Sequence, residues 1–402
     1  MRAAIEPCAL RGTVTAPPSK SMAHRMLICA ALAEGESVVR PIELSEDILA
    51  TADGLRALGA GIRAEGDALA VTGCRPAEAG SAVIPCRESG STLRFLLPLC
   101  LLNGKEMKLT GSGRLPERPL DVYEALCRER GFRLERTPEG VTVQGKLAPG
   151  EYTVRGDLSS QFITGLLYAL SLLDGDSTLN VLPPIESEPY LEMTLQAMDA
   201  SGVKVGREGN LLRIPGGQGY LAGEKTVEGD WSNAAFFSAL KAAGHPVEVT
   251  GLKADSLQGD RVCEEYFRRI SAGGASVDVA DCPDLAPVLM AFAAMCGGAE
   301  LTGTRRLRFK ESDRGQVMAE ELAKFGVSAE IRENGIRVGN ETPERPKEIL
   351  QGHNDHRIVM ALAVLCTKTG GTIGGAEAVR KSFPGFWDAL RSLGARVGLT
   401  GE

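Results

Sequence analysis

The sequence lacks the long apolar stretches that would place it in a membrane. In its 402 residues no apolar run approaches the roughly 20 residues that a bilayer-spanning helix needs. The run 26–33 follows Lys20 and Arg25 and ends in an Ala-x-Ala pattern, as a signal peptide does. It is only eight residues long and follows a Pro17-Pro18 turn. We therefore expect no export and a cytoplasmic location.

The residues that hold metals and common cofactors are also scarce. The ten cysteines never form Cys-x-x-Cys, so we expect reduced core thiols rather than disulfides or zinc ligands. Four histidines are present, and the segment 353–356 has no third clustered ligand that would complete a metal site. No G-x-x-x-x-G-K-[ST] occurs, and the GSG at 111–113 lacks the third glycine of a dinucleotide fingerprint. We expect neither a metal nor a cofactor.

An excess of positive charge is missing as well. The chain has 45 Lys and Arg against 52 Asp and Glu, a net charge of −7. A dedicated binder of nucleic acid or of an anionic membrane needs a broad basic field, so we expect neither partner. A negative net charge is still compatible with a local pocket lined by Lys and Arg.

Glycine, in contrast, is abundant, and its 48 copies mark a repeat. Six times an apolar helical segment ends near a glycine, a short strand and a polar loop follow, and a second helical segment ends at another glycine. The second marker glycine follows the first by 24 to 29 residues in every copy. The markers that end the first segments are Gly35, Gly104, Gly175, Gly244, Gly297 and Gly370.

One repeat of roughly 70 residues holds two helices and about four short strands. The Asn-Gly step at 334–335, between alternating residues, predicts a hairpin that closes one copy. Six copies predict an α/β protein of the α+β type with two domains of three repeats, divided near Gly229. The fourth copy is short, and the segment 281–284 replaces its return strand. A repeat that breaks its own pattern suggests a functional position.

The starts of the six first helices are equivalent positions, and their composition is unusual. All are rich in Ser, Asn or Asp, which predicts N-caps. Capping does not explain the cations Lys20, Arg25, Arg94 and Arg357, because positive charge near a helix N-terminus opposes the helix dipole. Helix N-termini with added cations are good sites for phosphate and carboxylate.

Loops after the first strands carry further cations in Gly-rich or Ser-rich sequence. Any one of them alone is better explained as a solvated surface charge, but together they predict a pocket for a small substrate with several negative charges. These loop cations are Arg114, Arg118, Arg305, Arg306, Arg308, Lys310, Arg314, Arg380 and Lys381.

Seven ordered motifs across nearly the whole chain resemble the 5-enolpyruvylshikimate-3-phosphate synthase family: PPSKSMAHR, ESGSTLRFLLPL, GSGRLPERPL, DLSSQF, KESDR, NDHRIVMALA and KSFPGFW. The resemblance implies two domains of three βαβαββ units each. It places residues 1–18 with 229–402 in one domain, which carries Asp284, Glu311, Arg357 and Lys381. Residues 19–228 form the other domain, with the shikimate 3-phosphate site.

The same resemblance implies an activity and two small anionic substrates. The family transfers the enolpyruvyl group of phosphoenolpyruvate to the 5-hydroxyl of shikimate 3-phosphate and releases phosphate. Residues implied for phosphoenolpyruvate are Lys20, Gly90, Arg94, Arg118, Gln161, Arg314, His356, Arg357 and Lys381, with Arg314 and Arg357 on its carboxylate. Residues implied for shikimate 3-phosphate are Lys20, Ser21, Arg25, Ser159, Ser160, Gln161, Ser187, Tyr190, Asp284 and Lys310.

The chemistry needs one group to accept the hydroxyl proton and another to protonate the methylene carbon. The resemblance implies Asp284 as candidate base and Glu311 as candidate acid, with Lys20 sharing in proton transfer. A simpler interpretation of Glu311 is an i,i+3 ion-pair partner of Arg314. Glu88, Ser91 and Arg306 depart from residues common in the family.

Two alternatives stay open from the sequence. The sister reaction on UDP-N-acetylglucosamine uses the same fold, but its enzymes typically have a Cys in the loop that residues 111–118 form here. A non-catalytic scaffold of six repeats needs no loop cations at all. We expect a monomeric enzyme with two small-molecule substrates.

Overall fold

The computed structural model describes residues 1–401, which divide into two compact units. Unit 1 joins Met1–Pro17 to the chain from Gly229 onward, and unit 2 is Pro18–Glu228. The sequence-based division put residue 18 on the other side of this boundary. Each unit buries its own hydrophobic core.

The strands of unit 2 form three four-stranded sheets and one two-stranded sheet among the described residues. In sheet order they are β16 (Glu224–Thr226), β4 (Glu36–Arg40), β6 (Ala68–Thr72) and β5 (Gly61–Glu65); β7 (Val83–Pro85), β8 (Met107–Thr110), β10 (Gly140–Gln144) and β9 (Arg133–Thr137); β11 (Glu151–Arg155), β12 (Ser177–Leu182), β14 (Leu211–Ile214) and β13 (Gly206–Glu208); and β15 (Tyr220–Leu221) with β3 (Ala33–Glu34).

The strands of unit 1 form two four-stranded sheets and a two-stranded one. They are β22 (Leu350–Gln351), β23 (Gly371–Gly374), β1 (Arg2–Glu6) and β24 (Arg396–Thr400); β18 (Ser276–Asp278), β19 (Ala299–Thr302), β21 (Gly335–Val338) and β20 (Ala329–Ile331); and β17 (Val247–Thr250) with β2 (Gly12–Thr15).

The five four-stranded sheets have the same pairing directions from one edge to the other, so the sequence repeat is also a repeat of strand pairing. Each begins with a parallel pair and continues with two antiparallel pairs, as in β7∥β8 with Ile84 opposite Leu109, followed by β10 and β9. The fourth repeat has only the parallel pair β17 and β2. The expected hairpin at Asn334-Gly335 is confirmed, since Ile331 of β20 pairs with Ile336 of β21.

Each repeat contributes two helices. The first helices are α1 (Lys20–Ala31), α3 (Gly90–Cys100) and α5 (Ser160–Leu170) in unit 2, and α7 (Trp231–Ala242), α9 (Ala286–Met295) and α11 (His356–Thr369) in unit 1. The second helices are α2 (Glu46–Ala57), α4 (Asp121–Arg130), α6 (Glu188–Asp199), α8 (Cys263–Ser271), α10 (Arg314–Lys324) and α12 (Phe386–Ser392). Short 3-10 turns lie at η1 (Pro76–Glu78), η2 (Leu115–Glu117), η3 (Gly259–Val262), η4 (Pro283–Leu285), η5 (Arg305–Phe309) and η6 (Ala376–Lys381).

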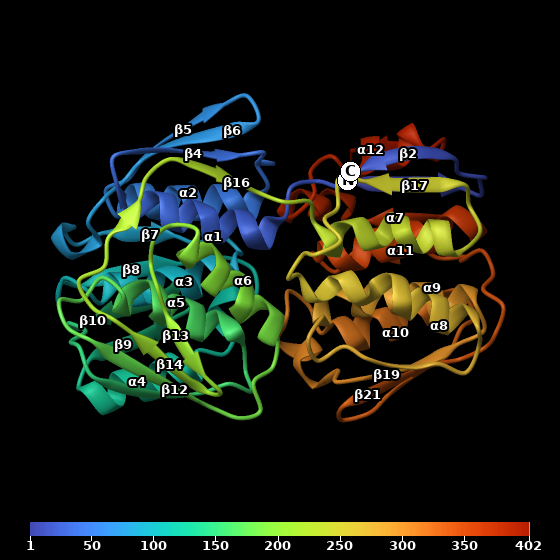
Figure 1. The fold of residues 1–402 in the computed structure, drawn as a ribbon. Coiled ribbons are helices and arrows are strands. Elements are labelled where there is room, and N and C mark those ends of the chain that lie inside the picture. The colour runs from blue at the N-terminus through green and yellow to red at the C-terminus, as the bar shows by residue number, and fades with distance from the viewer. Residues whose placement is uncertain (402) are drawn as a thin grey trace. The chain divides into compact units, whose positions relative to one another are not determined.

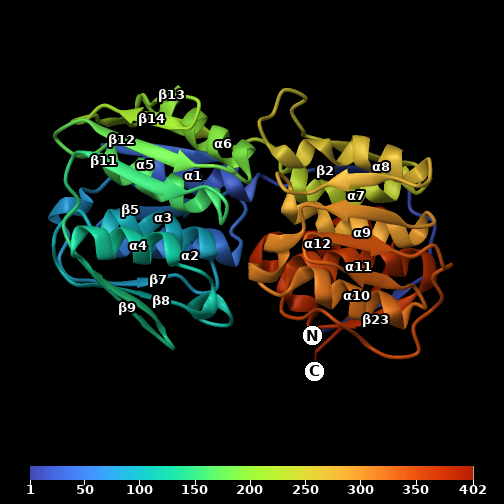
Figure 2. The same ribbon diagram turned by 90° about the horizontal axis from the view of Figure 1, so that it is seen from below.

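The first helices lie in the middle of each unit, because they are apolar on every side (Figure 1). In α9 nine of its ten residues are buried, and in α11 twelve of fourteen. The second helices bury a single face, as α4 does with Val122, Tyr123, Leu126 and Cys127. Seen from below, α9 and α11 of unit 1 pack side by side (Figure 2).

Helix ends follow the expected chemistry. Side chains cap five of the six first helices: Ser19, Ser89, Ser159, Asp230 and Asp355. The second helix α4 ends at Gly131, whose φ of 69° is left-handed and suits glycine. The predicted N-caps are confirmed at these five positions. Helix α9 is the exception, because its cap position is Leu285 and no side chain caps it.

The ends of the chain meet in unit 1. Strand β1 pairs antiparallel with β24, with Arg2 opposite Thr400. All ten cysteines are free thiols, and seven of them are buried. Among residues 1–401 no helix combines the length and the apolar character needed to cross a membrane.

Candidate active site

In unit 2 the start of α1 presents Lys20, the first residue of the helix. Ser19 caps the helix by accepting a hydrogen bond from the N–H of Met22. The ammonium of Lys20 donates to Asp47 Oδ2 of α2 at 2.7 Å. The sequence alone did not single out Asp47, because an acid in the first turn of a helix is accounted for by the helix dipole.

Arg25, one turn further along α1, is a buried cation surrounded by neutral groups. Its three donor nitrogens bind Thr194 Oγ1, the carbonyl of Ser21 and the carbonyl of Tyr190 at 2.7–2.9 Å. Its guanidinium also lies 5.4 Å from the centroid of the Phe95 ring. Burial lowers the pKa of Arg25. Among the described residues no carboxylate pairs with it, so an anionic ligand beside Arg25 would be stabilised.

The starts of α3 and α5 are linked by polar side chains. Arg94 Nη1 donates to Gln161 Oε1 at 2.7 Å, and Gln161 Nε2 donates to Ser91 Oγ at 2.9 Å. The guanidinium of Arg94 also lies 5.0 Å from the Phe162 ring centroid. The structure thus brings together two residues of the ESGSTLR motif and one of the DLSSQF motif, which are 67 and 70 positions apart in the chain.

Gly90 has a steric role that the sequence did not reveal. A Cβ atom at this position would lie 2.7 Å from Nη1 and 2.8 Å from Cζ of Arg118. The guanidinium of Arg118 therefore packs directly on the backbone at the start of α3. Arg136 donates to the carbonyl of Arg118 at 3.1 Å and so supports this loop.

The remaining predicted residues of unit 2 occupy helix starts. Ser159 caps α5 and accepts from the N–H of Gln161, while Ser160 is the first residue of that helix and is buried. Ser187 precedes α6 with a left-handed φ of 58°, and its carbonyl accepts from the N–H of Tyr190. Ser21 lies beside Arg25 through its carbonyl.

In unit 1 Arg314 is the centre of a cluster of three carboxylates. Its side chain is 1% exposed, and it donates to Asp284 Oδ1 at 2.7 Å, to Glu311 Oε2 at 2.8 Å and to Asp355 Oδ2 at 2.9 Å. Burial alone would lower the pKa of Arg314, but Asp355, Glu311 and Asp284 raise it. The i,i+3 pair of Glu311 with Arg314 is present, as the simpler interpretation of Glu311 predicts.

Asp284 lies in the turn η4, which leads directly into α9 and therefore belongs to the start of a first helix, not to a return strand of the fourth repeat as expected. Its carboxylate joins several cations. Lys310 Nζ donates to its Oδ1 at 3.0 Å, and Arg357 Nη2 lies 3.7 Å from its Oδ2. The pKa of Lys310 is lowered by burial and by Arg314, although Asp284 and Glu311 act in the opposite direction. The segment 281–284 thus places a carboxylate among three cations.

Arg357 follows the cap Asp355 at the start of α11 and is 2% exposed. Its backbone N–H donates to Asp355 Oδ1 at 2.9 Å, and its guanidinium lies 5.8 Å from the Phe236 ring centroid. The atoms Nε and Nη1 are buried, and no residue in the described part of the chain accepts a hydrogen bond from them. Buried N–H donors without acceptors are rare and costly, which makes them a signal for a ligand oxygen.

Lys381 ends η6 and donates through Nζ to the carbonyl of Asn354. Asn354 and His353 are consecutive left-handed residues, with φ of 52° and 49°. His356, the first residue of α11, is buried, and its Nδ1 lies 3.9 Å from Asp355 Oδ1. The four predicted residues Arg314, His356, Arg357 and Lys381 are therefore connected through the segment 353–357.

One residue of this cluster, Asp355, was missed in the sequence. Asp355 is fully buried and accepts from Ser312, from Arg314 and from the backbone of Arg357. Its place inside the NDHR motif was the available signal, but the capping role of an Asp accounted for it. Arg306, which the sequence already placed among the loop cations, is buried and donates to the carbonyl of Ala280, next to the segment 281–284.

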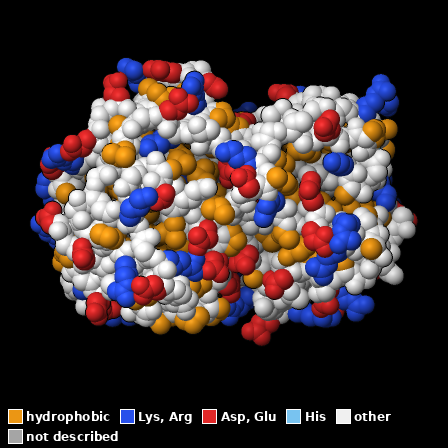
Figure 3. Space-filling view, viewed as in Figure 1, with side chains coloured by type: hydrophobic (Ala, Val, Ile, Leu, Met, Phe, Trp, Pro, Cys, Tyr) orange, Lys and Arg blue, Asp and Glu red, His pale blue; other side chains and the backbone are white. Residues whose placement is uncertain are grey.

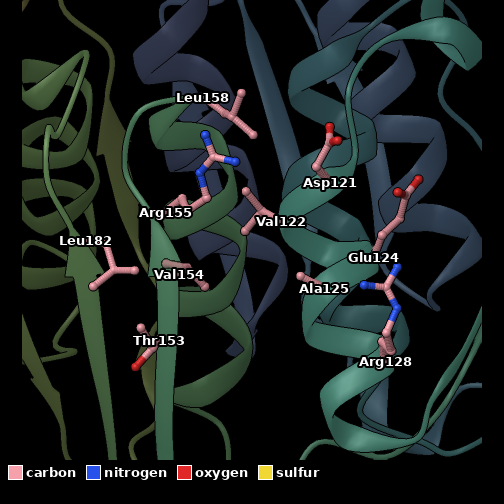
Figure 4. Close-up of a pocket in the computed structure, with 10 residues that line it drawn as sticks. All are labelled: Asp121, Val122, Glu124, Ala125, Arg128, Thr153, Val154, Arg155, Leu158 and Leu182. Carbon is pink, nitrogen blue, oxygen red and sulfur yellow. The ribbon is translucent and has the colours of Figure 1, made fainter.

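One cavity of unit 2 lies away from these residues. It has a volume of about 310 Å³ and lies between α4 and β11, with Asp121, Arg128 and Arg155 among its lining, and it includes none of the predicted site residues (Figure 4). In residues 1–401 no three His, Cys, Asp or Glu side chains gather as a metal-binding group.

The surface charges are arranged differently from the buried ones. On the face drawn in Figure 3, Lys and Arg side chains are interspersed with Asp and Glu side chains on each unit. The cations of the predicted site, such as Arg25, Arg94, Arg314 and Arg357, are buried instead. The net charge of −7 is a sum over the whole chain, so it does not reveal that these cations are buried.

Known proteins match this chain over its whole length. The model of the family "EPSP synthase (3-phosphoshikimate 1-carboxyvinyltransferase)" matches residues 5–390. The 3-phosphoshikimate 1-carboxyvinyltransferase of Clostridium kluyveri is 39% identical, covering 98% of this chain and 97% of its own. The enzyme of that name from Clostridium novyi is 36% identical with the same coverage. The structure of EPSP synthase from Acinetobacter baumannii shares the fold, with a TM-score of 0.78 at 24% identity over 99% of this chain and 100% of the other. The chain therefore belongs to the EPSP synthase (3-phosphoshikimate 1-carboxyvinyltransferase) family.

Proposed function

We propose that this chain performs the reaction of its family with the buried cations and carboxylates described above. In that reaction the enolpyruvyl group of phosphoenolpyruvate moves to the 5-hydroxyl of shikimate 3-phosphate. The products are 5-enolpyruvylshikimate 3-phosphate and phosphate, in the shikimate pathway to chorismate. The observation that carries the proposal is that Arg357, at the start of a capped helix, has two buried donor atoms, Nε and Nη1, without an acceptor among the described residues.

Phosphoenolpyruvate carries a carboxylate and a phosphate, and the proposal assigns separate cations to each. The carboxylate takes the free donors Nε and Nη1 of Arg357. It reaches Arg314 by replacing Asp284 or Glu311, because those carboxylates occupy the donors of Arg314. This exchange would release one carboxylate from its ion pair with Arg314 when phosphoenolpyruvate binds.

The phosphate of phosphoenolpyruvate is assigned to the cations Lys20, Arg94, Arg118 and Lys381, with Gln161 and His356 as further contacts. The stacking of Arg118 on Gly90 supports this assignment, because it holds the guanidinium beside the N-terminus of α3. A phosphate there would gain both cation contacts and backbone N–H groups.

Shikimate 3-phosphate is assigned chiefly to unit 2. The phosphate is placed at Ser159, Ser160 and Gln161, where the start of α5 offers hydroxyls and N–H groups. The ring and carboxylate are assigned to Ser21, Arg25, Ser187 and Tyr190, together with Lys20, Asp284 and Lys310. The neutral surroundings of Arg25 support this assignment, since a substrate carboxylate would supply the missing counter-charge.

The proposed chemistry has two stages. A base takes the proton of the 5-hydroxyl while its oxygen bonds to C2 of phosphoenolpyruvate, and an acid protonates the C3 methylene, which gives a tetrahedral ketal phosphate. Loss of a proton from the methyl group then expels phosphate and restores the double bond. Asp284 is proposed as the base, Glu311 as the acid, and Lys20 as a partner in proton transfer. Fixed cations hold the two anions together against their repulsion.

Three coarser expectations belong to this proposal. We propose that the enzyme is a monomer. The ten free thiols suit a reducing compartment such as the cytoplasm. The assigned chemistry uses proton transfer and fixed charge, so we propose that the reaction runs without a metal or cofactor.

The test is release of inorganic phosphate from phosphoenolpyruvate in the presence of shikimate 3-phosphate, and in a second arm with UDP-N-acetylglucosamine. The proposal expects release in the first arm and none in the second. Release in the second arm alone would assign the sister reaction. Absence of release in both arms would favour the non-catalytic scaffold.

A further inference from the structure

The loop between β22 and α11 is held in a conformation that its own residues do not favour. His353 and Asn354 both have left-handed backbones, with φ of 49° and 52°, and neither is glycine. Such residues cost free energy and persist where surrounding contacts over-determine them. Gly352 before them is crowded as well, because a Cβ atom there would lie 2.5 Å from Val359 Cγ2. Some neighbouring group must therefore hold this loop.

Glu321 of α10 is that group on the strand side of the loop. Its side chain is 2% exposed. Burial acts to raise the pKa of Glu321, but hydrogen bonds from His353, Lys324 and the backbone of Gln351 together lower it. Oε2 accepts from the N–H of Gln351 at 2.9 Å, and Oε1 accepts from Nε2 of His353 at 3.0 Å. One buried carboxylate thus binds the loop at two points.

The other side of the loop leads to the proposed phosphoenolpyruvate residues. The carbonyl of Asn354 accepts from Lys381 Nζ, and the N–H of Asp355 donates to the carbonyl of Gly352 at 2.9 Å. Asp355 in turn holds the backbone of Arg357 and the guanidinium of Arg314. A change in the left-handed pair would turn the Asn354 carbonyl away and move Lys381 and the start of α11 together.

We infer that Glu321 and His353 are positioning residues for the phosphoenolpyruvate site: their contact holds the left-handed loop 353–354 that aims the Asn354 carbonyl at Lys381 and sets the start of α11. They act through Lys381 and Arg357 and are assigned no contact with either substrate. The inference rests on the proposed function, because it concerns the binding of one of its substrates.

The first test is Glu321→Gln, which keeps the size of the side chain and removes the charge that holds His353 and Gln351. We expect KM for phosphoenolpyruvate to rise about tenfold, since misplacement of binding groups by a fraction of an ångström is costly. We expect kcat and KM for shikimate 3-phosphate to stay within about threefold of wild type. Glu320→Gln is the matched control, because Glu320 is the next residue of α10, is exposed and binds Gln316. It should leave all three constants unchanged.

A purely structural role predicts something else. It would lower the fraction of folded enzyme, so the apparent kcat would fall while KM for phosphoenolpyruvate stayed constant, and that result would overturn the inference. Unchanged KM and kcat in Glu321→Gln would overturn it as well.

A second pair of variants keeps the inference testable if Glu321→Gln does not fold. His353→Ala removes the ring and leaves the backbone strained, whereas His353→Gly removes the ring and relieves the left-handed φ. Both should raise KM for phosphoenolpyruvate, with the smaller rise in His353→Gly. Wild-type KM in His353→Ala would overturn the inference. Failure of the proposed function gives a different result. In that case the wild-type enzyme itself releases no phosphate when both substrates are present.

Discussion

A glycine and an arginine in unit 2 show how closely the proposed site is packed at the scale of single residues. The backbone of Gly90 has no left-handed φ, so its conformation does not require glycine. The missing side chain instead makes room for the guanidinium of Arg118, which would clash with a Cβ atom. The contact lies at the far end of a flexible side chain. A larger residue at position 90 would therefore be accommodated by moving Arg118, with little cost to the fold.

We predict that Gly90→Ala raises KM for phosphoenolpyruvate about tenfold, because Arg118 leaves the start of α3. KM for shikimate 3-phosphate and the melting temperature should change little. Steady-state kinetics with each substrate varied in turn would measure this. Gly80→Ala is the control, since Gly80 lies in unit 2 with open space around its missing Cβ and without a positive φ. An unchanged KM for phosphoenolpyruvate in Gly90→Ala would show that Arg118 does not contact this substrate.

Arg357 allows function and stability to be separated. A buried cation with two unbonded N–H groups costs stability in the ligand-free protein, and a methionine of similar length would fill its place. We predict that Arg357→Met keeps or raises the melting temperature and lowers kcat/KM for phosphoenolpyruvate by about 100-fold or more. Thermal denaturation without ligand and initial rates would measure the two effects. A clear fall in melting temperature with normal kcat/KM would mean that Arg357 serves the fold.

Sequence reasoning reached some of these residues and missed others for a physical reason. The caps Ser19, Ser89 and Asp355 follow from local chemistry within three residues, so the sequence predicts them. The pairing of Lys20 with Asp47 depends on how α1 packs on α2, 27 positions away. Nothing local in the segment 45–48 signals that contact.

At the scale of elements, three helices of unit 2 are joined by a buried chain of hydrogen bonds. His24 Nδ1 of α1 lies 2.7 Å from Thr51 Oγ1 of α2, which lies 2.7 Å from Thr92 Oγ1 of α3. Thr92 gives its hydroxyl proton to Ser89 Oγ at 2.8 Å. Thr51 must therefore donate to Thr92, and His24 must donate to Thr51. The direction of the chain fixes the Nδ1–H tautomer of a neutral imidazole.

This network predicts a pH effect on stability. Burial, and after it the charges of Lys20 and Arg25, hold the pKa of His24 well below 6.5 in the folded protein. In the unfolded chain His24 takes up a proton as the pH falls through about 6.5, whereas the folded protein does not, so its contribution to stability is present above that pH and is lost below it.

We predict that wild-type protein loses about 1 kcal/mol more stability than His24→Asn between pH 7 and pH 5.5. Asparagine keeps a donor for Thr51 but does not titrate. Urea unfolding followed by far-UV circular dichroism would measure this, since both tryptophans, Trp231 and Trp387, belong to unit 1 and report on the other core. Equal losses in the two proteins would mean that His24 is protonated in the folded state.

The helices and strands also show which parts of the repeat the sequence could predict and which it could not. The spacing of glycines gave six copies, because helix ends and hairpins obey local rules. It could not show that β1 closes a sheet with β23 and β24 at the other end of the chain. Strands more than 360 residues apart pair only when the whole unit has assembled. A local sequence pattern therefore does not predict that pairing.

At the scale of the whole molecule, the two units have separate cores and unequal shares of the proposed substrate contacts. For shikimate 3-phosphate, eight of the ten assigned residues lie in unit 2, and Asp284 and Lys310 lie in unit 1. Arg314, His356, Arg357 and Lys381, assigned to phosphoenolpyruvate, lie in unit 1. The two substrates should therefore stabilise the units to different degrees, because a ligand lowers the frequency of local opening where it binds.

Hydrogen exchange read by mass spectrometry can test this division. With saturating shikimate 3-phosphate alone, we predict slower exchange at the starts of α1, α5 and α6 in unit 2, where N–H groups and serines are assigned to the ligand. The segment 350–357 of unit 1, which carries Arg357, should change much less. Inorganic phosphate at equal concentration is the control for a general anion effect. Stronger protection of 350–357 than of the α5 start would assign shikimate 3-phosphate to unit 1. Arg25 and Ser160 would then need another assignment, because the neutral groups around Arg25 leave its charge without a counter-charge.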